Sequence, residues 1–548
     1  MVKRRLMQKL VCNGLIFLFF APTLSLILPS FNSYEPGGVF NWLLGEYVLN
    51  TLIILSGVGF LTFVFGVGAA CAVTFLRFPG RGLLRVLLFL PLAVPGYITA
   101  LSYVQFFDFS SDFSLFFREV FGFKHLFRIQ SLYGAIFVMS VAFYPYVYMF
   151  SLARITSAGN FVAISRSCGK SFLATMLEVV IPVARPAIVG GLTLVLMEVI
   201  SDFGIMQFFG LQTVVTGIYR KWFLLNDVIG ASRLILFLLT FVALMIFLEK
   251  TSRQNAFYGN GVVNYDINPC WSLTPLKGMT VTIVLSLLPL FGIGFPIFSL
   301  ISMTLNATPD YQLFSLIIGS VQIALFASFL TILIAFFFVY MKRKKKIGAA
   351  LFQMSNLGYS IPGLVVGMGI INFFTSSSSI LSYFTFSGFQ ILTAGTFTAL
   401  MYSYIFRFLA LGCNSIQSGI EKIPSEISWT MRLVGKNSFL DAIQVYSPML
   451  IRYLVSGVIL IFLDTLKELP ATLLVRPFNF ETMSIRVYEL VVDERYNDAA
   501  VPALIMTAIC LAVILFLIKS MYSRGLHNRK KGARIGCLCD VCLSKNEC

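Results

Sequence analysis

Charged residues are scarce in this chain of 548 residues, where Asp, Glu, Lys and Arg together make up 12%. An ordinary soluble domain has about 25% charged residues, and 58% of this chain is hydrophobic. Several stretches carry no charge at all, namely 47–76, 129–153, 279–309, 311–341 and 347–406. About 20 consecutive apolar residues cross a bilayer as a helix. The composition therefore excludes a soluble fold and predicts an all-α integral membrane protein.

Residues suited to catalysis are equally rare. The chain has two histidines, His125 and His527, and its sequence contains no serine triad, paired-carboxylate site or metal-protease motif. The tripeptide Gly169-Lys170-Ser171 resembles the end of a phosphate-binding loop, but that motif needs a glycine at position 164, where the chain has Ile164. We therefore expect no enzyme activity, no metal or cofactor, and no nucleotide site in this chain.

Basic residues outnumber acidic ones by 41 to 24, which gives a formal net charge of +17. They lie between the apolar runs, in alternate loops that include Arg81, Lys170 and Arg407, and in the tail. This distribution indicates cytoplasmic loops and cytoplasmic termini, and it argues against nucleic acid as a partner. The run 11–29 has no cleavage signature after it and is interpreted as a retained first helix. Twelve membrane helices are expected, near 11–29, 49–77, 84–107, 131–153, 183–206, 230–249, 277–304, 313–341, 348–373, 389–411, 449–469 and 499–519.

An internal repeat divides the chain into two similar parts. The segment Arg166-Ser167-Cys168-Gly169-Lys170 recurs as Arg432-Leu433-Val434-Gly435-Lys436, at an offset of 266 (432 − 166). Three further landmarks keep nearly the same offset: Pro182 with Pro448, Val94-Pro95-Gly96 with Ile361-Pro362-Gly363, and Glu198 and Asp202 with Asp464 and Glu468. Repeats of this kind are typical of transporters. We expect a first half at 1–255, a linker at 256–275, a second half at 276–520, and a basic, cysteine-containing tail at 521–548.

The repeated segment lies in an inward loop of each half, at 160–182 and 422–448. Its pattern predicts a helix, a turn and a second helix, because Gly169 and Gly435 can adopt the positive φ of a sharp turn. Apolar residues after the first glycine are spaced for one helix face: Phe172, Leu173, Met176 and Leu177. Pro182 and Pro448 suit the first turn of the next membrane helix, where a missing N–H costs little.

These loops resemble the cytoplasmic "EAA" loop of ATP-binding-cassette importer permeases, in which a proline follows the loop glycine by thirteen residues. The acidic-Ala-Ala start of that pattern is replaced here by Ala163-Ile164-Ser165 and Trp429-Thr430-Met431. Later segments, Glu198 to Gly204 and Asp464 to Arg476, resemble the fused, two-half permeases of ferric iron importers. The resemblance implies a type I importer permease of about twelve helices, in a bacterial inner membrane, in contact with lipid.

The resemblance also implies partners and roles. Two copies of a cytoplasmic ATPase subunit would bind ATP and Mg²⁺, and a periplasmic binding protein would deliver the substrate. The loops would act as coupling helices that contact the ATPase through Arg166, Gly169, Lys170, Pro182, Arg432, Gly435, Lys436 and Pro448. Two alternatives stay open: a permease of the same kind for thiamine or another small solute, and a secondary transporter driven by an ion gradient.

Four acidic residues are candidates for the substrate path: Glu198, Asp202, Asp464 and Glu468. Ferric ion is a hard cation that prefers carboxylate oxygen, and charged groups at membrane depth are costly unless they face water or one another. Alternatively, they are interfacial residues or pair with Lys467 and Arg476. The tail cysteines Cys537, Cys539 and Cys542 leave two readings as well, a zinc or iron–sulfur centre or incidental thiols.

Overall fold

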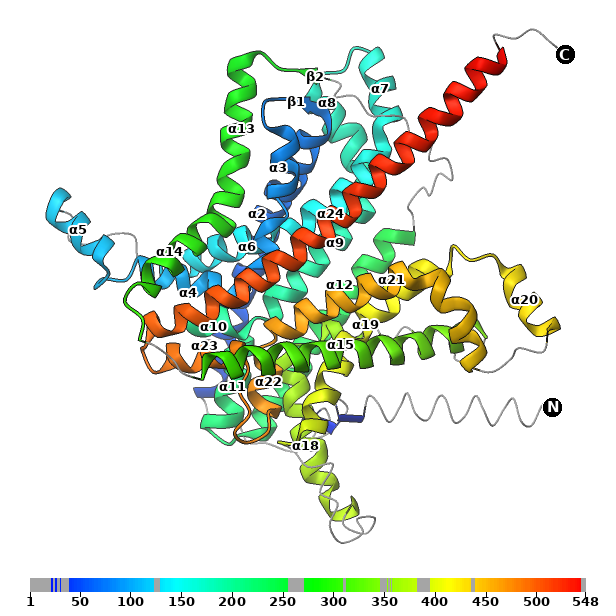
Figure 1. Cartoon of the computed structure of the whole chain (residues 1–548). Helices are drawn as coiled ribbons and strands as arrows, with labels where there is room; N and C mark the ends of the chain where they lie inside the picture. The colour runs from blue at the N-terminus through cyan, green and yellow to red at the C-terminus, as the bar shows by residue number, and fades with distance from the viewer. Residues whose placement is uncertain are drawn as a thin grey trace.

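The computed structural model describes residues 39–122, 129–254, 271–308, 312–344, 357–381, 395–434 and 439–543, with a few single positions in 21–30 and 352–355. Nearly all of the described chain is helical (Figure 1). Its strands are limited to a two-residue parallel pair, in which β1 (Leu76–Arg77) joins β2 (Trp271–Ser272). The predicted all-α membrane fold is confirmed.

The helices of the first half follow one another from α2 to α12. They are α2 Val39–Phe75, α3 Arg81–Leu87, η2 Leu90–Ala93, α4 Gly96–Phe106, α5 Asp112–Phe121, α6 Leu132–Ile155, η3 Thr156–Ala158, α7 Gly159–Ser167, α8 Phe172–Thr175, η4 Met176–Val180, α9 Ile181–Ser201, α10 Phe203–Phe208, α11 Val214–Tyr219, η5 Arg220–Leu224 and α12 Val228–Gln254.

The second half repeats much of this order. Its helices are α13 Pro275–Pro289, η6 Leu290–Gly294, α14 Phe295–Thr304, α15 Leu313–Arg343, α17 Leu357–Ser360, α18 Gly363–Leu381, α19 Phe397–Ile420, α20 Ser425–Leu433, α21 Phe439–Lys467, α22 Pro470–Val475, α23 Met483–Val492 and α24 Tyr496–Leu543.

Eight helices of the described chain are long and apolar enough to cross a membrane, and a bent pair makes nine if it counts as one span. The eight are Leu44–Phe75, Leu132–Ile155, Phe172–Ser201, Val228–Thr251, Pro275–Thr304, Leu313–Arg343, Ile443–Lys467 and Tyr496–Lys519. Three expected spans are not among the nine. The span at 11–29 lies almost wholly outside the described residues, α18 contributes the shorter apolar stretch Gly363–Thr375, and α19 is 24 residues long but contains Arg407.

The bent pair joins Arg81–Ala93 to Gly96–Phe106 at an angle of 90°. Pro95 causes the break, because it has no N–H to donate and it holds Val94 in an extended conformation (φ −87°, ψ 121°). The repeated landmark Pro362-Gly363 separates α17 from α18 in the second half in the same way.

Equivalent helices pack in equivalent groups. In the first half α2, α6 and α9 contact one another, and in the second half α15, α19 and α21 do. A pair of matching hydrogen bonds supports the equivalence: Val214 N–H donates to Thr51 Oγ1 (3.0 Å), and Met483 N–H donates to Ser320 Oγ (2.9 Å). Both donors and both acceptors are 269 residues apart (483 − 214 and 320 − 51). The sequence repeat is therefore also a repeat of contacts.

Described residues near the start of each half contact the other half. Asn372 of α18 donates through Nδ2 to the carbonyl of Ser25 (3.1 Å). In the opposite direction, Ser299 of α14 donates to the carbonyl of Ser102 in α4 (2.9 Å), and Tyr103 of α4 donates to the carbonyl of Phe291 (2.8 Å). Hydroxyl and amide groups form these cross-contacts because such groups find no water in a bilayer core. The two halves are interlocked at both edges.

Candidate functional site

A cavity of about 110 Å³ lies between the two halves. Glu198 of α9 and Asp202, directly after α9, reach it from the first half. Asp464 of α21 and Glu468, directly after α21, reach it from the second half. All four acidic residues that the sequence singled out for a substrate path therefore line one cavity.

Asp202 and Glu468 occupy equivalent positions. Each carboxylate caps the short helix after the membrane span: Ile205 N–H donates to Asp202 Oδ1 (2.8 Å), and Ala471 N–H donates to Glu468 Oε1 (3.2 Å). A capping carboxylate satisfies an otherwise unpaired helix N–H. α10 begins directly after Asp202, and α22 begins one residue further on, at Pro470, after Glu468 and Leu469.

The Pro-Gly landmarks make room for these two carboxylates. A Cβ atom at Gly96 would lie 2.9 Å from Asp202 Oδ2, and a Cβ atom at Gly363 would lie 2.6 Å from Glu468 Oε1. Any side chain at either position would displace the acidic group. Two repeated features, the Pro-Gly pair and the acidic residue, therefore belong to one local structure that occurs twice.

The two copies differ in their partners. Glu468 forms an ion pair with Nη1 of Arg407, which α19 places in the cavity wall at 8% exposure. In the first half, Phe143 of α6 approaches the equivalent glycine, with its Cζ 3.2 Å from the ideal Cβ position of Gly96. Among the described residues Asp202 has no ion-pair partner. Both halves therefore supply acidic residues to the cavity at equivalent positions, whereas its basic residues come only from the second half.

Two hydrogen bonds cross the cavity from one half to the other. The Tyr359 hydroxyl of α17 donates to Glu198 Oε1 (2.6 Å). Lys467 Nζ of α21 donates to the carbonyl of Leu92 (2.5 Å), next to the break between η2 and α4. Both contacts link residues more than 150 positions apart, so they hold the halves together at this cavity.

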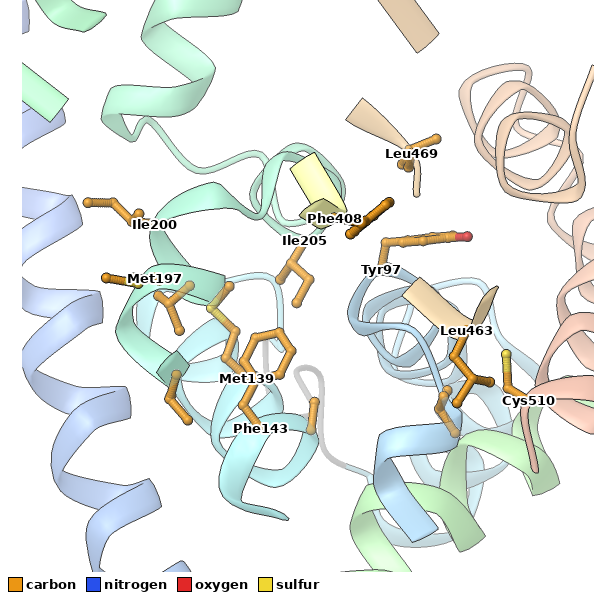
Figure 2. Close-up of a cluster of buried hydrophobic side chains, with 14 of the residues drawn as sticks. Tyr97, Met139, Phe143, Met197, Ile200, Ile205, Phe408, Leu463, Leu469 and Cys510 are labelled. Atoms are coloured by element: carbon orange, nitrogen blue, oxygen red, sulfur yellow. The ribbon is translucent and has the colours of Figure 1, made fainter. Parts of the chain in front are cut away.

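The charged lining has a formal net charge of −2, from four carboxylates and two bases (−4 + 2). Charges are costly at membrane depth, so the lining is suited to a positively charged guest. The adjacent wall is apolar: Figure 2 shows Tyr97, Ile205, Phe408 and Leu469 from both halves beside one another. No group of three or more His, Cys, Asp or Glu residues in the described part of the chain converges closely enough to hold a metal ion.

Some sequence expectations about this region were wrong. Arg407 was counted with the cytoplasmic loop charges, near the end of the expected span 389–411, but it lies in the middle of α19, which continues to Ile420. One alternative paired the acids with Lys467 and Arg476; in the structure Lys467 donates to the carbonyl of Leu92, and Arg476 pairs with Glu489 (2.5 Å) instead of a cavity acid. The sequence signal for Arg407 was available, since it is a single charge after a charge-free run of 60 residues (347–406).

The first inward loop has the predicted helix–turn–helix form. α7 ends at Ser167, Gly169 adopts a φ of +77°, and Ser171 Oγ accepts from Ala174 N–H at the start of α8. Arg166 lies with its guanidinium carbon 5.8 Å from the ring centre of Trp271, and Lys170 forms an ion pair with Glu178. Pro182 lies in the first turn of α9, as expected.

The apolar residues of this loop divide between a packed and an exposed environment. Leu173 and Leu177 are 69% and 65% exposed, whereas Met176 is 5% exposed. Phe172 packs edge-on against Trp271, with ring centres 5.2 Å apart. A π-helical turn at Met176–Val180 changes the helical phase there. The exposed leucines remain available for a partner.

The second inward loop is described only in part. α20 (Ser425–Leu433) forms its first helix, and Trp429, Leu433 and Val434 are strongly exposed. Gly435 and Lys436 lie outside the described residues, as does the side chain of Arg432. Pro448 lies inside α21 and not at its start, because the helix begins earlier, at Phe439. The tail cysteines fall on positions whose side chains are not described.

Comparison with known proteins gives one informative relative. No known family model matches the sequence. The chain is similar to the Fe(3+)-transport system permease protein FbpB 2 of Haemophilus influenzae, with 22% identity over 488 residues. The match covers 87% of this chain and 90% of that protein.

The similarity thus extends over both halves and both inward loops, and it accompanies a helical, membrane-type architecture. It confirms the resemblance that the repeated loops and acidic segments indicated. The chain is a multi-pass membrane protein homologous to a transport-system permease.

Proposed function

We propose that this chain is the transmembrane permease subunit of an ATP-driven, binding-protein-dependent importer, and that its cargo is ferric iron. The observation that carries the proposal is the cavity between the halves, where four carboxylates meet only two bases. Carboxylate oxygen suits a hard trivalent cation. The relative is an Fe(3+)-transport system permease protein, which supports the same cargo.

The cavity geometry favours transient binding over tight binding. The carboxylates surround the cavity without converging on a point, and two of them are engaged with Arg407 and Tyr359. A transport path must release what it binds. In the proposed mechanism, the cargo competes with these internal partners for the acidic groups and leaves when they return.

Movement between outward and inward openings requires the halves to separate at the cavity. The Tyr359–Glu198 and Lys467–Leu92 hydrogen bonds link the two halves across it. We propose that they belong to a closed state and break in each cycle. The cycle is driven by two ATPase subunits, which bind ATP and Mg²⁺, so the permease itself needs no cofactor and is not an enzyme.

The inward loops are the proposed contacts for the ATPase. Ile164, Leu173 and Leu177 are exposed in the first loop, and Trp429 and Leu433 in the second. Apolar side chains exposed in this way on a polar loop indicate a protein partner. Under this proposal the loops and both termini face the cytoplasm of a bacterium, and the binding protein docks at the opposite end.

Reconstitution in vesicles tests the proposal. Vesicles with this chain, its ATPase and its binding protein should take up labelled ferric iron with ATP, and uptake should stop without the ATPase. Parallel vesicles with labelled thiamine test the alternative cargo. Ferric iron uptake driven by an ion gradient, with this chain alone, would overturn the coupling, and thiamine uptake without iron uptake would overturn the cargo.

The cavity has its own test. The double variant Asp202→Asn and Asp464→Asn should reduce iron uptake at least tenfold, because it removes two negative charges from the lining. Asp493→Asn is the matched control, since Asp493 is exposed and lies outside the cavity. Equal uptake in the two variants would contradict a role for the cavity acids.

A further inference from the structure

Helix α5 (Asp112–Phe121) stands apart from the rest of the molecule. Figure 1 shows it projecting from the side of the helical bundle, beyond α4 and α14. Its ends are well defined: Ser111 Oγ accepts from Ser114 N–H at the start, and Gly122 ends it with a φ of +70°. It is therefore a well-defined helix. It packs little against the rest of the bundle.

The helix has one apolar face. Phe113, Phe116, Phe117, Val120 and Phe121 recur at helical spacing, whereas the other side carries Asp112, Ser114, Arg118 and Glu119 with a single apolar residue, Leu115. Phe116, Val120 and Phe121 are 60%, 57% and 56% exposed. Four phenylalanines on one face of a ten-residue helix would be unfavourable in water.

This apolar face continues the outer surface of the membrane helices. Its rings form a row in which Phe113 contacts Phe117 (5.9 Å between ring centres) and Phe117 contacts Phe121 (4.4 Å). At its inner end Phe113 packs against Phe106 of α4, with ring centres 4.6 Å apart and the rings tilted. Phe106 in turn contacts Phe298 of α14 (6.2 Å), which is 60% exposed within a candidate span. Nothing polar interrupts this row.

Chain connectivity limits where the helix can lie. α5 begins six residues after α4 ends (112 − 106), so it stays close to the end of α4. Arg118 secures it to the preceding turn, because Nη2 donates to the carbonyl of Phe109 (2.8 Å) and the guanidinium lies over the Phe109 ring. The next span, α6, leads to the first inward loop, so α5 lies at the opposite end of the bundle.

We propose that α5 is an interfacial helix whose phenylalanine face inserts among the lipid acyl chains of the leaflet opposite the inward loops. A short amphipathic helix with aromatic residues on its apolar face is suited to that position. The start of α4 carries Gly96 and Tyr97 of the cavity, and α5 lies at its other end. The lipid contact would thus anchor the helix that forms one wall of the cavity.

Photo-crosslinking in the assembled transporter tests this inference. A benzophenone amino acid is placed at Phe116 in one variant and at Glu119, on the polar face, in a control variant. The complex is embedded in lipid nanodiscs, mixed with the binding protein, irradiated and analysed by mass spectrometry. We expect lipid adducts at position 116 at least fivefold more often than at position 119.

Two results would overturn the inference. Adducts between position 116 and the binding protein would assign the face to protein docking. Equal numbers of lipid adducts at positions 116 and 119 would show that the phenylalanine face is not the one that faces lipid. Neither result bears on iron uptake, so the proposed function stands or falls separately. A second probe at Val120, on the same face as Phe116, repeats the test where the first variant fails to fold.

Discussion

The hydroxyl of Tyr359 donates a hydrogen bond of 2.6 Å to Oε1 of Glu198, and this bond joins the two halves across the cavity. Its two residues are 161 positions apart in the chain. A bond of this kind is favourable only while the halves are closed, so its removal changes the balance between closed and open states.

Tyr359→Phe should therefore open the cavity more often. Side-chain hydrogen bonds inside membranes contribute about 1 kcal/mol, which corresponds to a roughly fivefold shift in the equilibrium. The measurement is the alkylation rate of a cysteine placed at Ala142, which lines the cavity, in a background without exposed thiols such as Cys168. Tyr133→Phe is the control, because Tyr133 is 80% exposed. An unchanged rate in Tyr359→Phe would show that the bond does not hold the halves closed.

The Arg407–Glu468 pair predicts a pattern of coupled substitutions. Arg407→Gln leaves a buried carboxylate unpaired and should cost about 3–5 kcal/mol of stability. The double variant Arg407→Gln and Glu468→Gln should recover much of this loss, because no unpaired charge remains. Thermal unfolding of the purified protein in detergent measures both effects.

The Arg476–Glu489 pair is the control for this series, because its side chains are 27% and 32% exposed. Partly exposed pairs contribute about 1 kcal/mol or less, so Arg476→Gln should be mild. If the double variant at Arg407 and Glu468 were as unstable as Arg407→Gln, the pair would not be the source of the loss.

Gly363→Ala should damage the cavity although it adds a single methyl group. The new Cβ would lie 2.6 Å from Glu468 Oε1 and would also crowd Arg407. We expect reduced iron uptake with normal insertion into the membrane. Gly68→Ala is the matched change, because a Cβ at Gly68 meets nothing within 4 Å. Full uptake by Gly363→Ala would mean that the carboxylate position is unimportant.

Gly169 should be sensitive to backbone strain alone. Its φ is +77°, and a Cβ there meets nothing within 4 Å, so there is space for a side chain. A β-branched residue, however, adopts this positive φ only with strain. Gly169→Val should preserve insertion and abolish transport-linked ATP hydrolysis, most strongly together with Gly435→Val. Gly169→Asn should keep most of the coupling, because asparagine tolerates this conformation. Equal coupling in the valine and asparagine variants would exclude the turn as the cause.

Several features of the fold followed from the sequence because they depend on local composition. Uncharged runs predicted the membrane helices, since only a helix satisfies its own backbone groups in lipid. The repeat landmarks marked Gly169 as the turn and Asp202 and Glu468 as equivalent positions. The broken helix at Pro95 could also have been predicted, because proline lacks the N–H that a continuous helix needs.

Other features were decided only by the tertiary structure, because they depend on which distant residues meet. The sequence pattern counted Arg407 with the loop charges and gave no role to Tyr359, yet packing of α19 and α17 brings both to the same cavity. It likewise predicted one apolar face for Phe172, Leu173, Met176 and Leu177, but only the packing shows that Met176 is buried and Phe172 contacts Trp271 while both leucines stay exposed. Composition and spacing thus determined the helices and the repeat. The partner of each buried charge depended on residues that are distant in sequence, either within one half, as for Arg407 and Glu468, or across the halves, as for Tyr359 and Glu198.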